Sequence, residues 1–109
     1  MTDQGDDIEI VDAAADSRYE ARVDGTLAGV LEYQLHDGWI VLVHTEVQPA
    51  FEGRGIGSRL AKSALEDARA RRLAVTPQCP FVLGYIKRHR EYRDLIVGMR
   101  GPNRPPGSP

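Results

Sequence analysis

Three glycines alternate in the stretch EGRGIGSRL, residues 52–60, and this stretch restricts the fold more than any other feature of the sequence. An almost continuous apolar run at 39–43 precedes it, and apolar residues at helical spacing follow it from Leu60 onward. Glycine loses more conformational freedom on folding than other residues, so three in one loop need a compensating role. The pattern predicts a loop between a buried strand and a helix N-terminus, where a bare backbone lets an anion approach unpaired amides.

The first half of the chain predicts an antiparallel meander of strands. An Asp-Gly pair, which is a two-residue hairpin signal, separates the first two strands. The third strand contains the apolar run, which predicts that helices cover both of its faces. It ends before Pro49, because proline has no N–H to donate to a sheet. The predicted strands are 17–23, 26–35 and 38–47, with turns at Asp24-Gly25 and 36–38.

The second half predicts two helices and one more strand. Helical spacing after the glycines predicts a helix that ends near Arg71. The short apolar segment LAVT (Leu73–Thr76) predicts a strand that pairs in parallel with the apolar strand through a right-handed crossover. Pro80 suits the first turn of a second helix, which we expect to end at Gly98. The predicted fold class is α/β, with a mixed, mostly antiparallel sheet of about five strands, one βαβ unit and two main helices. The stripe expected on the second helix contains Val82, Ile86, His89, Tyr92 and Ile96.

The composition predicts one soluble domain. The 109 residues are 41% hydrophobic, and the net charge of −2 gives no general attraction to nucleic acid or acidic membranes. The single cysteine excludes an internal disulfide, and no apolar segment approaches the ~18 residues that span a membrane. The start MTDQGDDIEI lacks the pattern of a signal peptide, so we expect a cytoplasmic protein. We expect one domain at 8–98, a disordered acidic N-terminus at 1–7 and a flexible Pro/Gly-rich tail at 99–109.

The residues around the glycines favour a phosphate-bearing ligand. Arg54 and Arg59 add positive charge, and Ser58 adds a hydroxyl. The order of the glycines matches neither the P-loop pattern G-x-x-x-x-G-K-[ST] nor the Rossmann pattern G-x-G-x-x-G. A tight strand-to-helix turn with no ligand is the alternative interpretation.

The stretch HTEVQPAFEGRGIGSRLAKSALEDAR resembles the pyrophosphate-binding motif of the GNAT superfamily of CoA-dependent N-acetyltransferases. The superfamily pattern Q/R-x-x-G-x-G/A reads EGRGIG here, with Glu52 in place of Gln or Arg. From about Tyr19 to Tyr92 the chain is more similar to a branch of minimal single-domain members, which share HTEV, the glycine motif, a C-P pair and Y-I-K-R-H in this order. Full-size members insert two helices after their first strand to shape the acceptor pocket. The sequence lacks these helices, so the acceptor stays undefined.

The resemblance implies acetyl-CoA as co-substrate and no metal. Backbone amides of the glycine loop would hold the CoA pyrophosphate, and main-chain groups of Glu46 and Val47 would meet the pantetheine arm. A basic cluster at 87–93 could meet the 3′-phosphate of CoA, or it could be an ordinary solvated face. The expected CoA-binding residues are Val47, Gly53, Arg54, Gly55, Ile56, Gly57, Ser58, Arg59 and Lys87.

Four residues are candidates for the chemistry of acetyl transfer, which needs a proton acceptor and stabilisation of a leaving thiolate. The ordinary pKa of histidine suits His44 as a general base, and Glu46 shares its strand face. Cys79 precedes the helix start at Pro80, where the helix N-terminus would lower its thiol pKa; it could pair with His44 and carry the acetyl group. The resemblance implies that Tyr85 protonates the departing CoA sulfur. The structural alternatives are a packed histidine, a solvated carboxylate, a small buried cysteine and an interfacial tyrosine.

The leading hypothesis is a small acetyl-CoA-dependent N-acetyltransferase that works by direct transfer or through a Cys79 acyl-enzyme. A non-catalytic acyl-CoA-binding module, or a protein-interaction domain with the same fold, is the alternative. The expected partners are acetyl-CoA and an unidentified amine acceptor, with no nucleic acid and no membrane. The edge strands of a small sheet leave both a monomer and a homodimer open.

Overall fold

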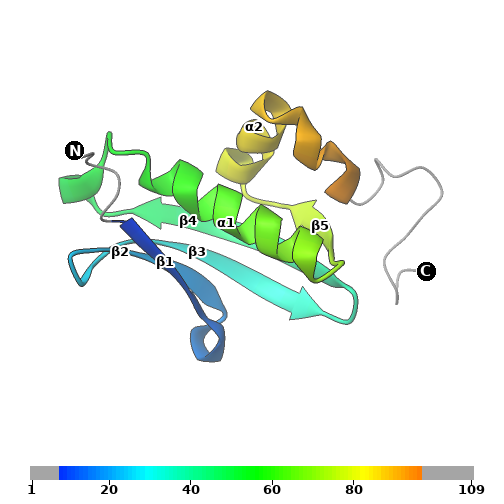
Figure 1. Cartoon of the computed structure of the whole chain (residues 1–109), viewed down its shortest axis with the longest axis horizontal. Helices are drawn as coiled ribbons and strands as arrows, with labels where there is room; N and C mark the ends of the chain where they lie inside the picture. Colours follow the sequence, from blue (N-terminus) through cyan, green and yellow to red (C-terminus); the bar gives the residue numbers. More distant parts are fainter. Residues whose placement is uncertain (1–7, 97–109) are drawn as a thin grey trace.

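The computed structural model describes residues 8–96 and contains one five-stranded sheet with two α-helices (Figure 1). The strands lie in the order β1-β2-β3-β4-β5. Strands β1 to β4 pair antiparallel with their neighbours, and β5 pairs parallel with β4. This mixed, mostly antiparallel sheet confirms the predicted fold class. The elements are β1 (Ile8–Ala13), η2 (Ala14–Asp16), β2 (Arg18–Val23), β3 (Thr26–His36), β4 (Trp39–Val47), η3 (Pro49–Phe51), α1 (Ile56–Ala70), β5 (Ala74–Pro77), α2 (Pro80–Arg88) and η4 (Arg90–Leu95), where η marks a 3-10 helix.

Turn residues set the register of the strands. Asp24 and Gly25 have φ angles of 51° and 83°, the left-handed pair that a type I′ turn between two strands requires. β4 pairs with β5 from Trp39 to Leu42, and α1 makes the crossover between these two strands. The predicted hairpin and the predicted βαβ unit are both confirmed.

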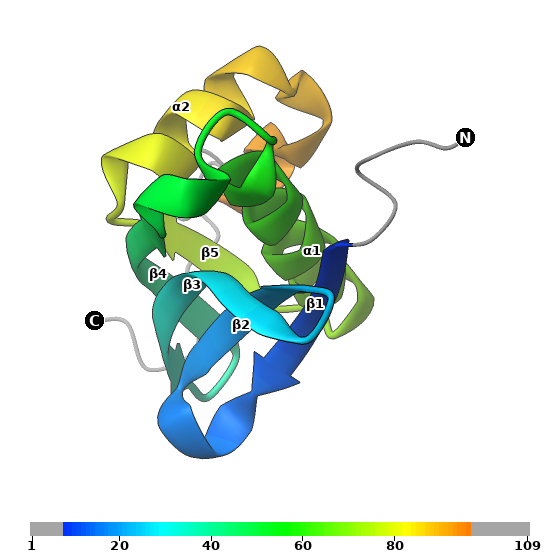
Figure 2. The same cartoon turned by 90° about the vertical axis from the view of Figure 1, so that its left-hand side faces the viewer.

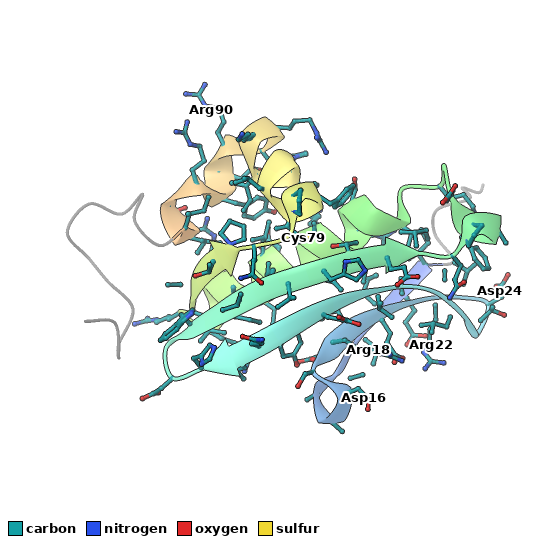
Figure 3. All side chains as sticks on the ribbon, turned by 180° about the vertical axis from the view of Figure 1, so that it is seen from behind. Asp16, Arg18, Arg22, Asp24, Cys79 and Arg90 are labelled. Carbon is teal, nitrogen blue, oxygen red and sulfur yellow. The ribbon has the colours of Figure 1, made fainter. Side chains whose placement is uncertain are left out.

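Both helices cover the same face of the sheet. α1 contacts α2, and residues of both belong to one hydrophobic cluster with Leu31 and Leu42 of the sheet. Figure 2 shows the two helices on one side, and Figure 3 shows the sheet from the other side, with the helices behind it. The prediction that helices cover both faces of β4 is therefore wrong. On the uncovered face, side chains of the sheet shield one another, and the rings of His36 and Trp39 stack with their centroids 4.5 Å apart.

The second helix is shorter than predicted. α2 ends at Arg88, and the 3-10 segment η4 continues the chain. His89 stands at the break with φ −125° and ψ 82°, and its Nδ1 lies 2.9 Å from the carbonyl oxygen of Tyr85. An ion pair of 3.0 Å between Arg69 of α1 and Asp94 holds η4 against α1. Apolar residues spaced three or four apart fit an α-helix and a 3-10 segment alike, so the stripe did not reveal the break.

β1 is a strand that the sequence pattern did not predict. Ile8 is buried and Glu9 is exposed, but the strand is short and lies next to an acidic segment. The disordered N-terminus expected at 1–7, the flexible tail expected at 99–109 and the helix end expected at Gly98 lie outside the described residues.

Candidate active site

β4 has a bulge at the point where its pairing with β5 ends. Tyr33 of β3 lies opposite Leu42, whereas the preceding Glu32 lies opposite His44, so Val43 is an extra residue in β4. Pairing with β5 ends at Leu42, and the rest of β4 has no β5 partner in residues 8–96. The two strands therefore separate at their C-terminal ends.

The register of β4 decides which of its main-chain groups face this opening. The amide of Gln48 donates to the carbonyl oxygen of Ala28 at 2.8 Å. In an antiparallel pair, the main-chain groups of successive residues point alternately toward and away from the partner strand. The groups of Glu46 therefore face β3, and those of Thr45 and Val47 face the opening. Of the two residues expected to offer main-chain partners to a ligand, Val47 is placed to do so and Glu46 is not.

Two of the three glycines shape the loop that leads into α1. Gly53 and Gly55 have φ angles of 84° and 77°, a conformation that residues with a Cβ rarely adopt, and Gly55 is the N-cap. No side chain caps this helix. Its first amides therefore lack a side-chain partner and carry the positive end of the helix dipole. The predicted loop between a buried strand and a helix N-terminus is confirmed, and its geometry suits an anion.

A cavity of about 280 Å³ extends from this helix N-terminus to the opening beside β4. Its walls come from the end of β4, the glycine loop, the first turn of α1 and the start of α2. The lining residues are Thr45, Val47, Phe51, Glu52, Gly53, Gly55, Ile56, Gly57, Ser58 and Phe81.

Most of the expected CoA-binding residues line this cavity, and three of them do not. The guanidinium carbon of Arg54 lies 5.5 Å from the ring centroid of Phe51. Arg59 reaches the carbonyl oxygen of Ile8 at 3.4 Å, and Lys87 lines a second cavity at the far end of α2. The expected residues that do line the cavity are Val47, Gly53, Gly55, Ile56, Gly57 and Ser58.

Of the four other lining residues, Glu52 belongs to the glycine motif, whereas Thr45, Phe51 and Phe81 were not predicted as part of the site. Thr45 faces the cavity only because of the bulge, and no sequence signal marks a bulge in an apolar strand. Phe81 is the second residue of α2, and a large aromatic residue in the first turn of a helix that follows a candidate nucleophile was the available signal.

Cys79, labelled in Figure 3, is not itself a lining residue but contacts the lining residue Thr45. It is 4% exposed and is the N-cap of α2, and its amide donates to the carbonyl oxygen of Leu42 at 2.9 Å. Its Sγ lies 3.3 Å from Oγ1 of Thr45. Burial raises the pKa of the thiol, but the Thr45 hydroxyl and the amides of Val82 and Phe81 stabilise the thiolate more strongly, so the pKa is lowered overall. This direction agrees with the prediction from the helix start.

His44 and Glu46 lie on the face of the sheet that the helices leave uncovered. Nε2 of His44 is 3.6 Å from Oε1 of Glu46, and the two side chains are 55% and 71% exposed. The prediction that they share a strand face is confirmed. The expected pair is not seen, because the side chains of His44 and Cys79 make no direct contact in the described part of the chain. The bulge turns His44 to the uncovered face, and it turns the neighbouring Thr45 to the thiol.

Comparison with known proteins places this arrangement in a family. The sequence model that describes GCN5-related N-acetyl-transferases matches residues 18–95, which is most of the chain. The chain belongs to this family. The resemblance found in the glycine motif is therefore confirmed. No curated protein matches the chain.

The fold of this GCN5-related protein is also found among solved structures. The NMR solution structure of a GCN5-like protein from Staphylococcus aureus matches it with a TM-score of 0.64 and 23% sequence identity. The match covers 84% of this chain and 90% of that chain. At this identity the similarity shows the fold alone.

In this family member, Tyr85 lies in an aromatic cluster and not in the cavity lining. Its ring stacks on His89 with the centroids 4.0 Å apart and an angle of 16° between the planes, and the ring of Tyr92 lies 6.2 Å away. Burial raises the pKa of Tyr85, and the nearby Glu91 and Glu66 raise it further. The phenol is therefore held in its protonated form. Its role as the proton donor to CoA stays a prediction.

Residues 8–96 contain neither a candidate metal site nor a candidate membrane-spanning helix. No group of three or more His, Cys, Asp or Glu side chains in residues 8–96 is placed to hold a metal ion. Neither helix there is long and apolar enough to cross a membrane.

Proposed function

We propose that this protein transfers an acetyl group from acetyl-CoA to the amine of an acceptor. One observation carries the proposal. A single cavity joins the uncapped N-terminus of α1 to Thr45, whose hydroxyl contacts the Cys79 thiol. The cavity therefore offers an anion site at one end and a nucleophile behind the other. Acetyl-CoA, the general co-substrate of the GCN5-related family, has a pyrophosphate and a thioester that suit these two ends.

The walls of the cavity fit the parts of CoA. The first amides of α1 suit the pyrophosphate, and Arg54 adds positive charge in the adjoining loop. Main-chain groups of Thr45 and Val47 suit the amides of the pantetheine arm. The ring of Phe81 suits its apolar atoms, because ligand pockets combine apolar walls with a few placed polar groups. Arg59 and Lys87 lie outside this lining. Lys87 lines the second cavity, and we propose separately that it contacts the 3′-phosphate of CoA.

Cys79 supplies a covalent route. Its thiolate attacks the thioester carbonyl of acetyl-CoA, so that a bond forms between Cys79 Sγ and the acetyl carbon and CoA leaves as a thiolate, which takes up a proton. The acceptor amine then attacks the Cys79 thioester. The new amide bond forms and the bond between the acetyl carbon and Cys79 Sγ breaks. The amine gives up one proton to a base, and Cys79 is regenerated as the thiolate. The lowered pKa of Cys79 supports this route over direct transfer, since the thiolate is the nucleophile.

His44 and Glu46 are the proposed acceptors of the proton that the amine loses. They lie just beyond the bulge, on the side of β4 away from the CoA cavity. An amine that arrives from the uncovered face of the sheet would meet these two side chains. A base on that side needs no contact with the thiol. The amine nitrogen must, however, lie within hydrogen-bond reach of the base, directly or through one water, while it attacks the Cys79 thioester where β4 and β5 separate.

Intact-mass spectrometry after mixing the protein with acetyl-CoA tests the covalent route. We expect a mass increase of one acetyl group, which is lost in Cys79→Ala. A matched control is His36→Ala, at the other end of the β3–β4 hairpin, which should keep the adduct. If acceptor amines release free CoA without any adduct, transfer is direct and the role given to Cys79 is wrong.

Release of free CoA in the presence of amines tests the function itself. A screen of polyamines, peptide amines and small primary amines should find at least one that accelerates release. His44→Ala should slow this step and leave the Cys79 adduct in place, because its proposed role begins with the amine. CoA binding without adduct or release would contradict the enzyme and favour the non-catalytic acyl-CoA-binding module.

A further inference from the structure

Phe81 is a large apolar residue that the fold leaves partly exposed at the mouth of the cavity. It is 40% exposed, although most apolar side chains of its size in the described residues are buried. Its ring lines the same cavity as Thr45, and it follows Cys79 by two residues. The residue therefore stands between the thiol and the glycine loop.

The absence of a side chain at Gly57 leaves the space in which this ring packs. A Cβ built at Gly57 would lie 2.8 Å from Cζ of Phe81, closer than real Cβ atoms approach, and 3.0 Å from its Cε2, which is a tight contact. Unlike Gly53 and Gly55, Gly57 lies within α1 without a positive φ, so the backbone conformation does not require glycine there. In this chain the Phe81 ring occupies the space that a methyl group would need.

We propose that Phe81, held against Gly57, closes one wall of the cavity and limits the size of the acyl group that the protein accepts. This inference rests on the proposed function. The acyl group must reach Cys79. Two lining residues are close to Cys79: Thr45 contacts its sulfur, and Phe81 follows it by two residues in the chain. The cavity is small, about 280 Å³, so one aromatic ring makes up a substantial part of its wall.

The limit on acyl size follows from the packing of the acyl group against the Phe81 ring. A well-filled apolar site resists extra methylene groups, because they force side chains out of their preferred positions. One methylene changes selectivity in an apolar pocket by about tenfold or more. Acetyl is therefore expected to fit, whereas butyryl and hexanoyl would collide with the ring.

The test compares the dissociation constants of CoA, acetyl-CoA, butyryl-CoA and hexanoyl-CoA, measured by calorimetry on the full chain. Every protein compared, including the one that is wild type at position 81, carries Cys79→Ala, so that no covalent adduct forms during the titration. Each thioester is expressed relative to free CoA, so that contacts to the pantetheine arm cancel. In the wild type, hexanoyl-CoA should bind at least about tenfold more weakly than acetyl-CoA, and in Phe81→Ala the two should differ by less than about threefold. Leu83→Ala is the matched control. Leu83 lies on the same helix but lines the second cavity, so this variant should keep the wild-type ratio.

Equal binding of hexanoyl-CoA and acetyl-CoA by the wild type would overturn the inference, as would an unchanged ratio in Phe81→Ala. Failure of every CoA species to bind the wild type would instead overturn the proposed function. A thermal unfolding curve for each variant shows whether it folds, and the exposure of Phe81 predicts that Phe81→Ala does.

Gly57→Ala tests the packing of Phe81 on Gly57 without varying the length of the acyl chain. The added methyl should push the Phe81 ring out of its place and weaken binding of acetyl-CoA. In Gly57→Ala/Phe81→Ala no ring remains to be displaced, so the loss caused by Gly57→Ala should largely disappear. If the effects of the two substitutions simply add, Phe81 does not rest on Gly57 and the inference is wrong.

Discussion

The hydroxyl oxygen of Thr45 lies 3.3 Å from the sulfur of Cys79, at the point where β4 and β5 separate. Thr45 lines the cavity, and Cys79 lies behind it with 4% of its surface exposed. This hydroxyl therefore connects the ligand site to the thiol. The bulge at Val43 makes the contact between Thr45 and Cys79 possible. Without this extra residue, the β4 side chains that follow it would point to the opposite faces of the sheet.

Thr45→Val keeps the shape of the side chain and removes its hydroxyl. We expect the substitution to raise the pKa of Cys79, because the thiolate loses a hydrogen-bond donor. Loss of one such bond, about 1 kcal/mol, predicts roughly fivefold less thiolate at a pH below the pKa. Cys79 is the only cysteine, so the ultraviolet absorbance of its thiolate reports the titration directly. Thr76→Val on β5 is the control and should leave the curve unchanged. An unshifted curve in Thr45→Val would show that the hydroxyl does not act on the thiol.

Gly55→Ala separates the binding role of the glycine loop from its effect on stability. Gly55 and Gly25 have φ angles of 77° and 83°, and a Cβ at either position meets no atom within 4 Å. Each alanine substitution should therefore cost about 1–2 kcal/mol of unfolding free energy through backbone strain alone. Gly55→Ala should also reduce the rise in Tm that CoA produces, whereas Gly25→Ala, in a distant hairpin, should not. Equal CoA-induced shifts in both variants would remove Gly55 from the binding site.

Tyr85→Phe distinguishes a proton donor from a packed aromatic ring. Within residues 8–96 the Tyr85 hydroxyl donates no hydrogen bond, so its loss should change stability by less than about 0.5 kcal/mol. A fall in the rate of CoA release would then report lost proton donation. Tyr92→Phe is the comparison, because the Tyr92 hydroxyl donates to Glu66 and its removal should cost about 1 kcal/mol. Full activity in Tyr85→Phe would leave Tyr85 a packing residue.

The buried phenol of Tyr33 predicts a loss of stability in alkali. Burial and a hydrogen bond of 2.6 Å to Asp12 raise the pKa of Tyr33 to about 12. The unfolded phenol ionises near pH 10, so the unfolded state alone releases its proton between about pH 10 and pH 12. The contribution of Tyr33 is therefore complete below about pH 10 and is lost as the pH rises toward 12.

Urea unfolding at a series of pH values checks this sign. Tyr33→Phe should be less stable than the wild type near neutral pH, since it lacks the hydrogen bond, and its stability should fall less steeply above about pH 10. Asp12→Asn should also flatten the fall, because it removes the carboxylate that holds the proton. Parallel pH profiles for the wild type and Tyr33→Phe would exclude this phenol as the cause.

Local signals in the sequence were enough for most of the fold. The Asp24-Gly25 pair specified the first hairpin, and the change of period after the glycines specified α1 and the parallel β5. Pro80 correctly marked the start of α2. Each of these features depends on residues that are neighbours in the chain, so a single sequence contains the information.

The relationships across the site depend on a feature that no short pattern encodes. The bulge at Val43 reverses the faces of His44 and Thr45, and apolar strands with and without a bulge have the same composition. Residue chemistry alone therefore favours a His44–Cys79 pair, whereas the fold places Thr45 against the thiol. The contact between Phe81 and Gly57 likewise joins two helices and follows only from their packing.

Thermal unfolding of the full chain with and without CoA tests the central claim most directly. A site at the N-terminus of α1 predicts that CoA at about a hundred times its Kd adds about 2.7 kcal/mol of stability. For a domain of this size the Tm should then rise by several degrees. Dephospho-CoA in parallel shows whether Lys87 and its basic neighbours add affinity through the 3′-phosphate. A Tm that stays unchanged at millimolar CoA would contradict the CoA site and reduce EGRGIGSRL to a turn between a strand and a helix.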